Sequence, residues 1–221
     1  MYPPIAPRYL GAFGLALLFL FALLELEIIE VAYQKLGMSY RSVMSLLLAS
    51  ILGSYINIPI ASSAAGQLIQ DQEIFVNGVP YIVPHAIQVG RTVIAINLGG
   101  ALIPALLSLY LIVRTGTAIQ ALAVTLVVSM VVWHFARPVP GLGITVPGLI
   151  PGVLAAVLAI AIDRRRSAVI AYVGGAMGCL LGADIFNLAI VSHMHAPVAS
   201  IGGAGTFDGV FASGIIAVLL A

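Results

Sequence analysis

The sequence predicts an all-α membrane protein, a bundle of about seven transmembrane helices with one small β-hairpin outside the membrane. The composition is the first reason. The 221-residue chain is 62% hydrophobic and only 8% charged, whereas a soluble domain carries roughly 25% charged residues. The second reason is that the apolar residues gather in runs long enough to cross a hydrocarbon core about 30 Å thick. We therefore expect residues 1–221 to form a single transmembrane domain.

Each apolar run is expected to form one membrane-crossing helix. In chain order the runs cover residues 9–31, 42–61, 91–113, 117–135, 148–162, 167–188 and 206–221. The first run follows Arg8 but is too long for a signal peptide, and more apolar runs come after it. The last run reaches only about 24 Å at ~1.5 Å per residue. Its helix therefore either begins inside the membrane or continues beyond Ala221.

Two stretches between these runs are not expected to be helical. Residues 72–83 contain Asn77-Gly78 between alternating apolar residues, a pattern typical of a β-hairpin with a type I′ turn. Residues 137–152 hold four prolines and four glycines, which exclude one regular helix. Irregular backbone at membrane depth is tolerated only where protein buries it or where it lines a cavity. We expect this second stretch to be a cavity-lining loop or an apolar surface loop.

The basic residues predict the orientation of the bundle. Seven crossings place six cations on one side of the membrane and three on the other. The larger set is Lys35, Arg41, Arg114, Arg164, Arg165 and Arg166, and the smaller set is Arg8, Arg91 and Arg137. The positive-inside rule puts the larger set in the cytoplasm. In the cell (inner) membrane, the N-terminus and the hairpin would then lie outside and the C-terminus would be cytoplasmic.

The expected functional site lies within residues 182–214, where ionisable groups interrupt an apolar sequence. Asp184 falls near the end of the sixth run and Asp208 near the start of the seventh, on the same side of the membrane. An ionisable residue within a membrane segment is costly, and it indicates function by default. Other polar residues fall near the same ends of their segments, and they are Asn57, Asn97, His134, Arg137, Asn187, His193 and His195. We expect a polar outer cavity in which substrate contacts Asn57, Asn97, Arg137, Asn187, Gly203 and Gly205.

Two aspartates in such a cavity suit acid–base chemistry. When two carboxyl groups share one proton in a low dielectric, their pKa values separate, so one can act as base and the other as acid on a water molecule. Gly203-Ala-Gly205-Thr-Phe-Asp208 and Gly182-Ala-Asp184 resemble the motifs of the GxGD-type intramembrane aspartyl proteases, the presenilin and signal-peptide-peptidase group. Those proteases place one aspartate on the sixth helix and the other at the glycine-rich start of the seventh. This resemblance implies an endopeptidase that uses Asp184 and Asp208 to cleave transmembrane peptides.

The chain as a whole also resembles a family of bacterial and archaeal polytopic membrane proteins, and this second resemblance implies no activity. A secondary transporter or ion-coupled carrier would use similar residues, because intramembrane Asp and Asn in broken helices also describe transporter sites. A metal-dependent hydrolase would use His193 and His195 with the aspartates, which suit zinc, although the chain has no HExxH motif.

A purely structural role is the remaining alternative. In it, Asp208 caps the last helix and Asp184 pairs with Arg137. The formal charge of +1 argues against nucleic acid as a partner. We expect no cofactor, and as partners we expect membrane lipid together with a transmembrane peptide or a small solute.

Overall fold

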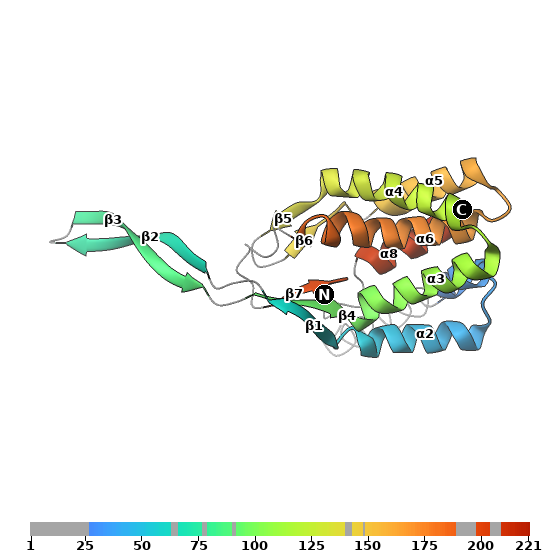
Figure 1. Ribbon diagram of the computed structural model, residues 1–221, viewed down its shortest axis with the longest axis horizontal. Coiled ribbons are helices and arrows are strands. Elements are labelled where there is room, and N and C mark those ends of the chain that lie inside the picture. Colours follow the sequence, from blue (N-terminus) through green and yellow to red (C-terminus); the bar gives the residue numbers. More distant parts are fainter. Residues whose placement is uncertain are drawn as a thin grey trace, which may run out of the picture.

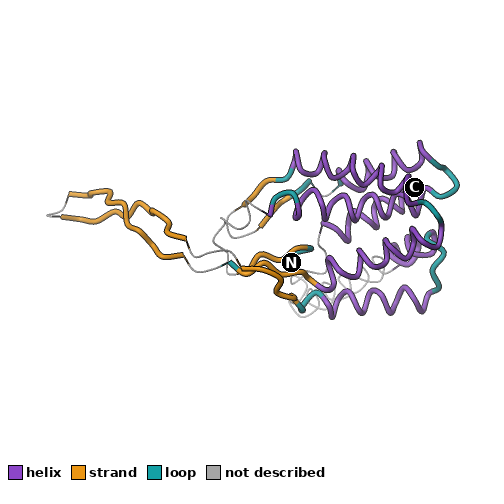
Figure 2. Tube along the Cα trace, in the orientation of Figure 1, coloured by secondary structure: helices purple, strands orange, loops and turns teal. Residues whose placement is uncertain are grey.

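The structure is a computed structural model that describes residues 27–62, 66–76, 79–89, 92–139, 143–147, 149–188, 198–203 and 209–221. This part of the chain is mostly helical. The helices lie side by side in a bundle, small sheets lie at one end of it, and a long hairpin projects away from that end (Figures 1 and 2).

The helices are Glu27–Lys35, α2 (Tyr40–Gly53), α3 (Ile103–Thr115), α4 (Ala118–Phe135), α5 (Ile150–Ile162), α6 (Ser167–Cys179) and α8 (Gly209–Leu220). Two π-helical segments, η1 (Leu98–Leu102) and η2 (Leu180–Ile185), precede α3 and extend α6. The strands are β1 (Asn57–Ser62), β2 (Gly66–Val76), β3 (Val79–Val89), β4 (Val93–Asn97), β5 (Arg137–Val139), β6 (Gly143–Thr145) and β7 (Val198–Ile201).

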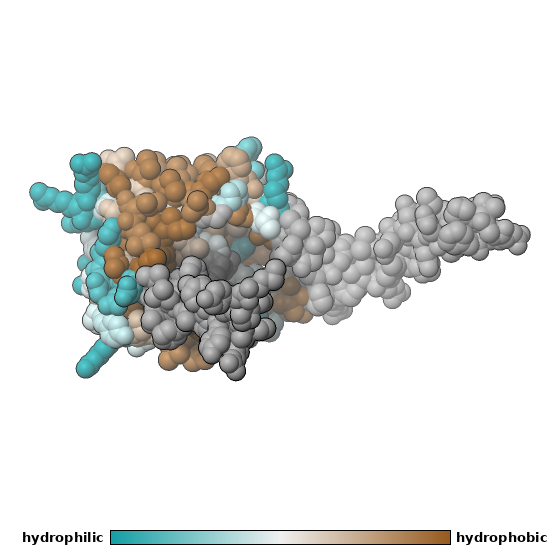
Figure 3. All heavy atoms as spheres, turned by 180° about the vertical axis from the view of Figure 1, so that it is seen from behind, coloured by the Kyte–Doolittle hydropathy of each residue, from teal (hydrophilic) through white to brown (hydrophobic). Residues whose placement is uncertain are grey.

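Three helices of the described chain are long and apolar enough to cross a membrane. They are Leu98–Thr115, Ala118–Phe135 and Ser167–Ile185, and the pair formed by Glu27–Lys35 and α2, bent by 117°, would make a fourth. On α4 the exposed face is as apolar as the buried one, with Ile119 82% and Met130 65% exposed, as expected of a helix that faces lipid. Apolar side chains cover the middle of the bundle, with hydrophilic side chains at its two ends (Figure 3).

Helix α6 lies at the centre of the bundle and packs against α3, α4, α5 and α8. Its glycines allow these neighbours to approach closely. A Cβ atom added to Gly178 would lie 2.7 Å from Cβ of Val128 on α4, and one added to Gly175 would lie 2.9 Å from the carbonyl oxygen of Ser213 on α8. The small-residue face that the sequence shows on this segment is therefore what holds the bundle at its observed spacing.

The second and third predicted helices are wrong where they approach the sheets. Residues 57–61 belong to β1 instead of continuing α2, and residues 93–97 form β4 ahead of η1 and α3. Both stretches are short and apolar, and the periodicity of such a run cannot separate a strand from a buried helix. Pro59 also removes one N–H that a helix would need. The loop predicted over 137–152 contains the short β5–β6 hairpin and the first turn of α5.

The hairpin predicted at 72–83 is confirmed and is longer than expected. Strands β2 and β3 pair antiparallel from Gly66↔Val89 to Val76↔Val79, so the two residues between the strands are Asn77 and Gly78. These two turn residues lie outside the described part of the chain. The asparagine–glycine signal therefore identified the position of the turn correctly.

A second sheet was not anticipated from the sequence. It has the order β1-β4-β7, with β1 antiparallel to β4 and β4 parallel to β7. This sheet joins the chain that follows α2, the chain that precedes α3 and the chain that precedes α8. It thereby brings residues far apart in the sequence to one end of the bundle (Figure 1).

We predict that Gly178→Leu destabilises the bundle by about 1–3 kcal/mol or prevents its assembly, because the added side chain has no space between α6 and α4. The measurement is helix content by circular dichroism during thermal unfolding in detergent. Ala118→Leu, at an exposed position of α4, is the matched control and should unfold like the wild type. Equal midpoints for the two variants would show that the close approach of α6 and α4 does not limit stability.

Candidate functional site

Asp184 lies where α6 ends, on the π-helical segment η2. The wide turn of this segment is visible in the hydrogen bond from the Phe186 N–H to the Leu181 carbonyl, 2.9 Å long. The buried amide of Asn187 donates to the carbonyls of Gly182 and Ala183 at 2.9 and 3.0 Å, which satisfies oxygens that a helix end leaves unpaired. This widened and capped helix end holds Asp184 in a half-buried position, and such π-helical bulges are frequent at functional sites.

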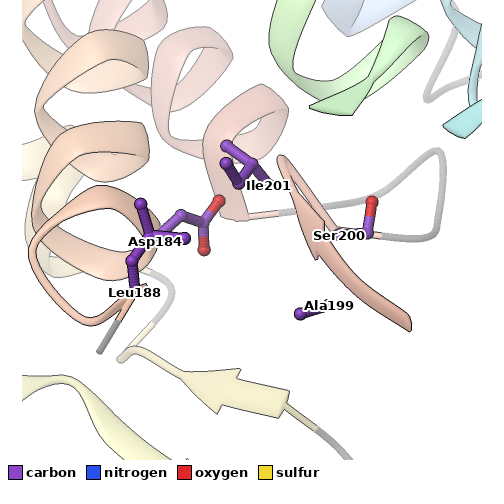
Figure 4. Close-up of a pocket in the computed structure, with 5 residues that line it drawn as sticks. All are labelled: Asp184, Leu188, Ala199, Ser200 and Ile201. Carbon is purple, nitrogen blue, oxygen red and sulfur yellow. The ribbon is translucent and has the colours of Figure 1, made fainter. Parts of the chain in front are cut away.

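The carboxylate of Asp184 faces a small pocket between η2 and β7 (Figure 4). The pocket is lined by Asp184, Leu188, Ala199, Ser200 and Ile201. Its volume of about 20 Å³ is enough for one water molecule. On the β7 side, Oδ2 of Asp184 accepts a hydrogen bond of 2.6 Å from the backbone N–H of Gly202. The pocket thus presents an acidic oxygen on a scale that suits water, while the Ser200 hydroxyl points away from Asp184 (Figure 4) and bonds to Asn57 and Gly203.

A network of amide and hydroxyl groups fixes the sheet next to this pocket. Asn97 is fully buried, and its Nδ2 donates to the Ser54 carbonyl at 2.7 Å and to Oδ1 of Asn57 at 3.2 Å. Oδ1 of Asn97 accepts from the Gly100 N–H at 2.7 Å. The Ser200 hydroxyl donates to the same Oδ1 of Asn57 at 2.6 Å. The network therefore ties β1, β4 and the start of η1 to β7.

Gly202 follows β7 in a conformation that favours glycine, with φ of +85°. A Cβ at this position would also lie 2.6 Å from the backbone nitrogen of Ala101 on η1. Glycine therefore allows the turn after β7 to rest on the turn after β4. This close contact brings the Gly202 N–H to the carboxylate of Asp184.

The predicted site residues are brought together in part. Asn57, Asn97, Asp184, Asn187 and Gly203 all lie at the sheet end of the bundle, although the Asn187 amide is occupied by its own helix end. Gly202, whose N–H contacts Asp184, and Ser200, whose hydroxyl ties β7 to Asn57, were missed. They belong to a strand, and to the turn after it, that the sequence did not predict.

Other predicted residues are peripheral or outside the described chain. Arg137 is exposed on β5. His134 is exposed at the end of α4, with its ring edge-on to Phe135 at 5.2 Å. Asp208, Gly205, His193 and His195 lie outside the described residues. Within the described ranges, no group of three or more His, Cys, Asp or Glu side chains is placed to hold a metal ion.

A sequence signal for the missed residues does exist. Ile96-Asn-Leu-Gly-Gly-Ala101 and Ile201-Gly-Gly-Ala204 are similar, and the structure pairs Ile96 with Ile201 across the parallel strands β4 and β7. The first motif runs from the end of β4 into η1, and the second begins at the last residue of β7. A comparison of the two motifs would have indicated a second strand–turn–helix unit beside Asp184.

A model of a protein family described as "Protein of unknown function (DUF1614)" matches residues 51–220. The chain belongs to this family. The matched range includes every described residue of the DUF1614 site, from Asn57 to Gly203. Searches of curated proteins and of solved structures found no match. The DUF1614 family region therefore covers the site.

We predict that Asn97→Leu lowers the free energy of unfolding by roughly 2–5 kcal/mol, because the Ser54 carbonyl and the Gly100 N–H lose their partner inside the protein. The readout is the temperature at which Cys179, the chain's one cysteine and a buried one, becomes reactive to a thiol dye in detergent. Gln34→Ala removes an exposed side-chain hydrogen bond to Glu30 and should leave that temperature unchanged. A shift no larger for Asn97→Leu than for this control would contradict the prediction.

Proposed function

We propose that this DUF1614 protein is an integral membrane hydrolase in which Asp184 and Asp208 activate a water molecule to cleave a peptide bond. The observation that carries the proposal is the pocket of one-water size into which the carboxylate of Asp184 points (Figure 4). A structural carboxylate needs only its hydrogen-bond donor, whereas a hydrolytic one also needs space for water beside it.

The packing of α8 on α6 supports the choice of Asp208 as the second carboxylate of the proposed site. The two helices run antiparallel, and the Ser213 hydroxyl donates to the Gly175 carbonyl at 3.0 Å. At the start of α8, a Cβ on Gly209 would lie 3.5 Å from the sulfur of Cys179. Asp208 precedes Gly209 directly, and Asp184 follows Cys179 by five residues, about 7.5 Å along a helix. The start of α8 and the end of α6 are thus neighbours, whereas Asp208 itself lies outside the described residues.

The hydrogen bond to Asp184 suggests how the roles divide. A backbone N–H donates more strongly to an ionised carboxylate than to a neutral acid, so the Gly202 N–H favours Asp184 as the base. In the proposed step, Asp184 takes a proton from water while the water oxygen bonds to the peptide carbonyl carbon, and Asp208 gives its proton to the carbonyl oxygen. In the collapse of this gem-diol intermediate, Asp184 gives the proton it took up to the nitrogen and the C–N bond breaks. One hydroxyl returns a proton to Asp208 as the carbonyl re-forms, so both aspartates regain their starting states.

The proposal includes seven membrane crossings with the N-terminus outside and the C-terminus in the cytoplasm. Its support is the distribution of charge. Lys35 ends the helix Glu27–Lys35, Arg114 belongs to the last turn of α3, and Arg164–Arg166 form the α5–α6 turn. These helix ends lie at the end of the bundle opposite the sheets (Figure 1). Asp184 is 17 residues beyond Ser167, about 26 Å along the helix. The site would then lie near the outer membrane surface, where water and the sheet meet the bundle.

In the described chain, β7 pairs along one edge only, with β4. Ser200 and Gly202 belong to β7 and to the turn after it, beside Asp184. A peptide in extended conformation would fit this edge better than a helix would, because its scissile bond must be accessible to water. We therefore propose an unwound transmembrane peptide as the substrate.

A secondary transporter is the second candidate, and one observation favours it. The units α2–β1/β4–α3 and α6–β7–α8 are similar in order and direction, and internal repeats are typical of transporters. However, transporter sites typically lie near the middle of the membrane, whereas Asp184 is close to one end of its helix. The metal-dependent alternative rests on His193 and His195 and stays a prediction.

We predict that cysteines introduced singly at Asn77 and Arg165, in a Cys179→Ala background, are labelled from opposite sides of the membrane. The residues belong to the hairpin turn and to the α5–α6 turn, at the two ends of the bundle. The measurement is labelling by a membrane-impermeant thiol reagent on intact and opened cells. Labelling of both cysteines from the same side would rule out the seven-crossing topology.

We predict that Asp184→Asn and Asp208→Asn each reduce cleavage of transmembrane peptides in liposomes by at least about 10²-fold. Asparagine keeps the size of aspartate and can still accept the Gly202 hydrogen bond, but it cannot exchange the required proton. The unfolding temperature read from Cys179 should stay near the wild-type value. Asp163→Asn, a carboxylate on the α5–α6 turn, is the matched control and should cleave normally.

The same liposomes separate the alternatives. Wild-type protein that takes up solute in response to a pH gradient and cleaves none of a broad peptide set would support the transporter. Cleavage that persists in Asp184→Asn would exclude Asp184 as the base. Cleavage that disappears on removal of metal would favour the histidine-based site.

A further inference from the structure

The end of the bundle opposite the sheets carries most of the positive charge of the protein. Six of the nine basic residues belong to it, and all six side chains are exposed. We call them the basic face, and they are Lys35, Arg41, Arg114, Arg164, Arg165 and Arg166. Figure 3 shows hydrophilic side chains protruding at the bundle ends. They lie directly beside the apolar side chains that cover the middle of the bundle, which we call the apolar belt.

Hydrogen bonds connect much of the basic face into one surface. The Lys35 ammonium donates to the carbonyls of Val218 and Leu219 at the end of α8, at 3.2 and 2.9 Å. The hydroxyl of Ser167, which follows Arg166, donates to the carbonyl of Ala221 at 3.1 Å. Lys35 and the Arg164–Arg166 turn therefore flank the same end of α8.

On the other side of Lys35, the Arg114 guanidinium donates to the Gly37 carbonyl at 3.3 Å and lies over the Tyr110 ring, 6.0 Å from its centre. Arg114 thus binds the turn that directly follows Lys35. The result is a row of cations that crosses the end of the bundle from α3 to the α5–α6 turn.

The three consecutive arginines of the α5–α6 turn are the most available for a ligand. Their turn is held by the carboxylate of Asp163, whose Oδ1 accepts the backbone N–H groups of Arg165 and Arg166 at 2.9 and 3.3 Å. The Asp163 carboxylate is therefore bound by backbone N–H groups and fixes the shape of the turn. The three guanidinium groups remain exposed and are not needed to hold that shape.

We propose that the basic face binds the anionic headgroups of phospholipids in the membrane leaflet that it faces. The cations lie where the apolar belt ends, which is the level of lipid phosphates when the belt lies in the hydrocarbon core. Guanidinium groups suit phosphate because they offer several donors in a planar fork. Clusters of Lys and Arg directly beside transmembrane helices are typical of anionic-lipid recognition. The proposal rests on the membrane insertion proposed above and is independent of the hydrolase chemistry.

The test uses the purified full-length chain and two lipids with identical acyl chains, phosphatidylglycerol and phosphatidylcholine. Lipids that stay bound after detergent exchange are counted by native mass spectrometry. We expect phosphatidylglycerol to be retained preferentially. We expect Arg164→Gln/Arg165→Gln/Arg166→Gln to reduce its retention by at least about tenfold, since each cation near an anionic surface contributes about fivefold. High salt should weaken retention in the wild type.

Arg137→Gln is the matched control, because Arg137 is also exposed but belongs to the sheet end. It should retain phosphatidylglycerol like the wild type, and the Cys179 unfolding temperature should show that both variants are folded. Equal retention of the two lipids, or equal loss in the triple variant and in Arg137→Gln, would overturn the proposal. Full displacement of the lipid by inorganic phosphate would overturn it as well, because it would identify a site for free phosphate.

Discussion

Backbone polar groups inside an apolar environment must be paired within the protein, and the sheet end of the bundle is arranged around this requirement. Here α2 and α6 stop, strands begin, and the N–H and C=O groups lose their regular helical partners. The amide of Asn97 pairs with Ser54 and Gly100, and the amide of Asn187 pairs with Gly182 and Ala183. The carboxylate of Asp184 pairs with Gly202. Polar side chains are retained at this end because the backbone needs them.

The position of these helix ends depends in turn on α6. Its glycines allow α4 and α8 to pack against it at a spacing that larger residues would not permit. Because α6 is fixed on several sides, η2 begins from a defined position, and so does the carboxylate that it carries. Close packing along α6 therefore sets the position of a site about 26 Å from the start of the helix.

Long apolar segments were predictable from the sequence, and short ones were not. The helices α4 and α6 follow from runs whose length alone decides their structure, and the hairpin follows from Asn77-Gly78. Strands β1 and β4 are too short for a pattern to identify them. The pairing of β4 with β7 joins residues more than 100 positions apart, which no local signal encodes. Asp184 was predictable because a carboxylate is rare in an apolar run, whereas Gly202 acts through an N–H that every residue except proline has.

The chain segments that contain β4 and β7 are similar, and a comparison of them addresses whether Asp184 has a purely structural role. In the first segment, the Gly100 N–H is satisfied by the neutral amide oxygen of Asn97. In the second, the Gly202 N–H is satisfied by a carboxylate. The motif Leu52-Gly-Ser-Tyr55-Ile at the end of α2 also resembles Leu181-Gly-Ala-Asp184-Ile at the end of η2. The residue that corresponds to Asp184 is thus Tyr55, which is 83% exposed.

The end of α2 therefore forms without a carboxylate at the position that corresponds to Asp184. A charged group at position 184 is costly in an apolar setting. What the carboxylate adds is the ability to take up and release a proton. This is the property on which both the hydrolase and the ion-coupled alternative depend.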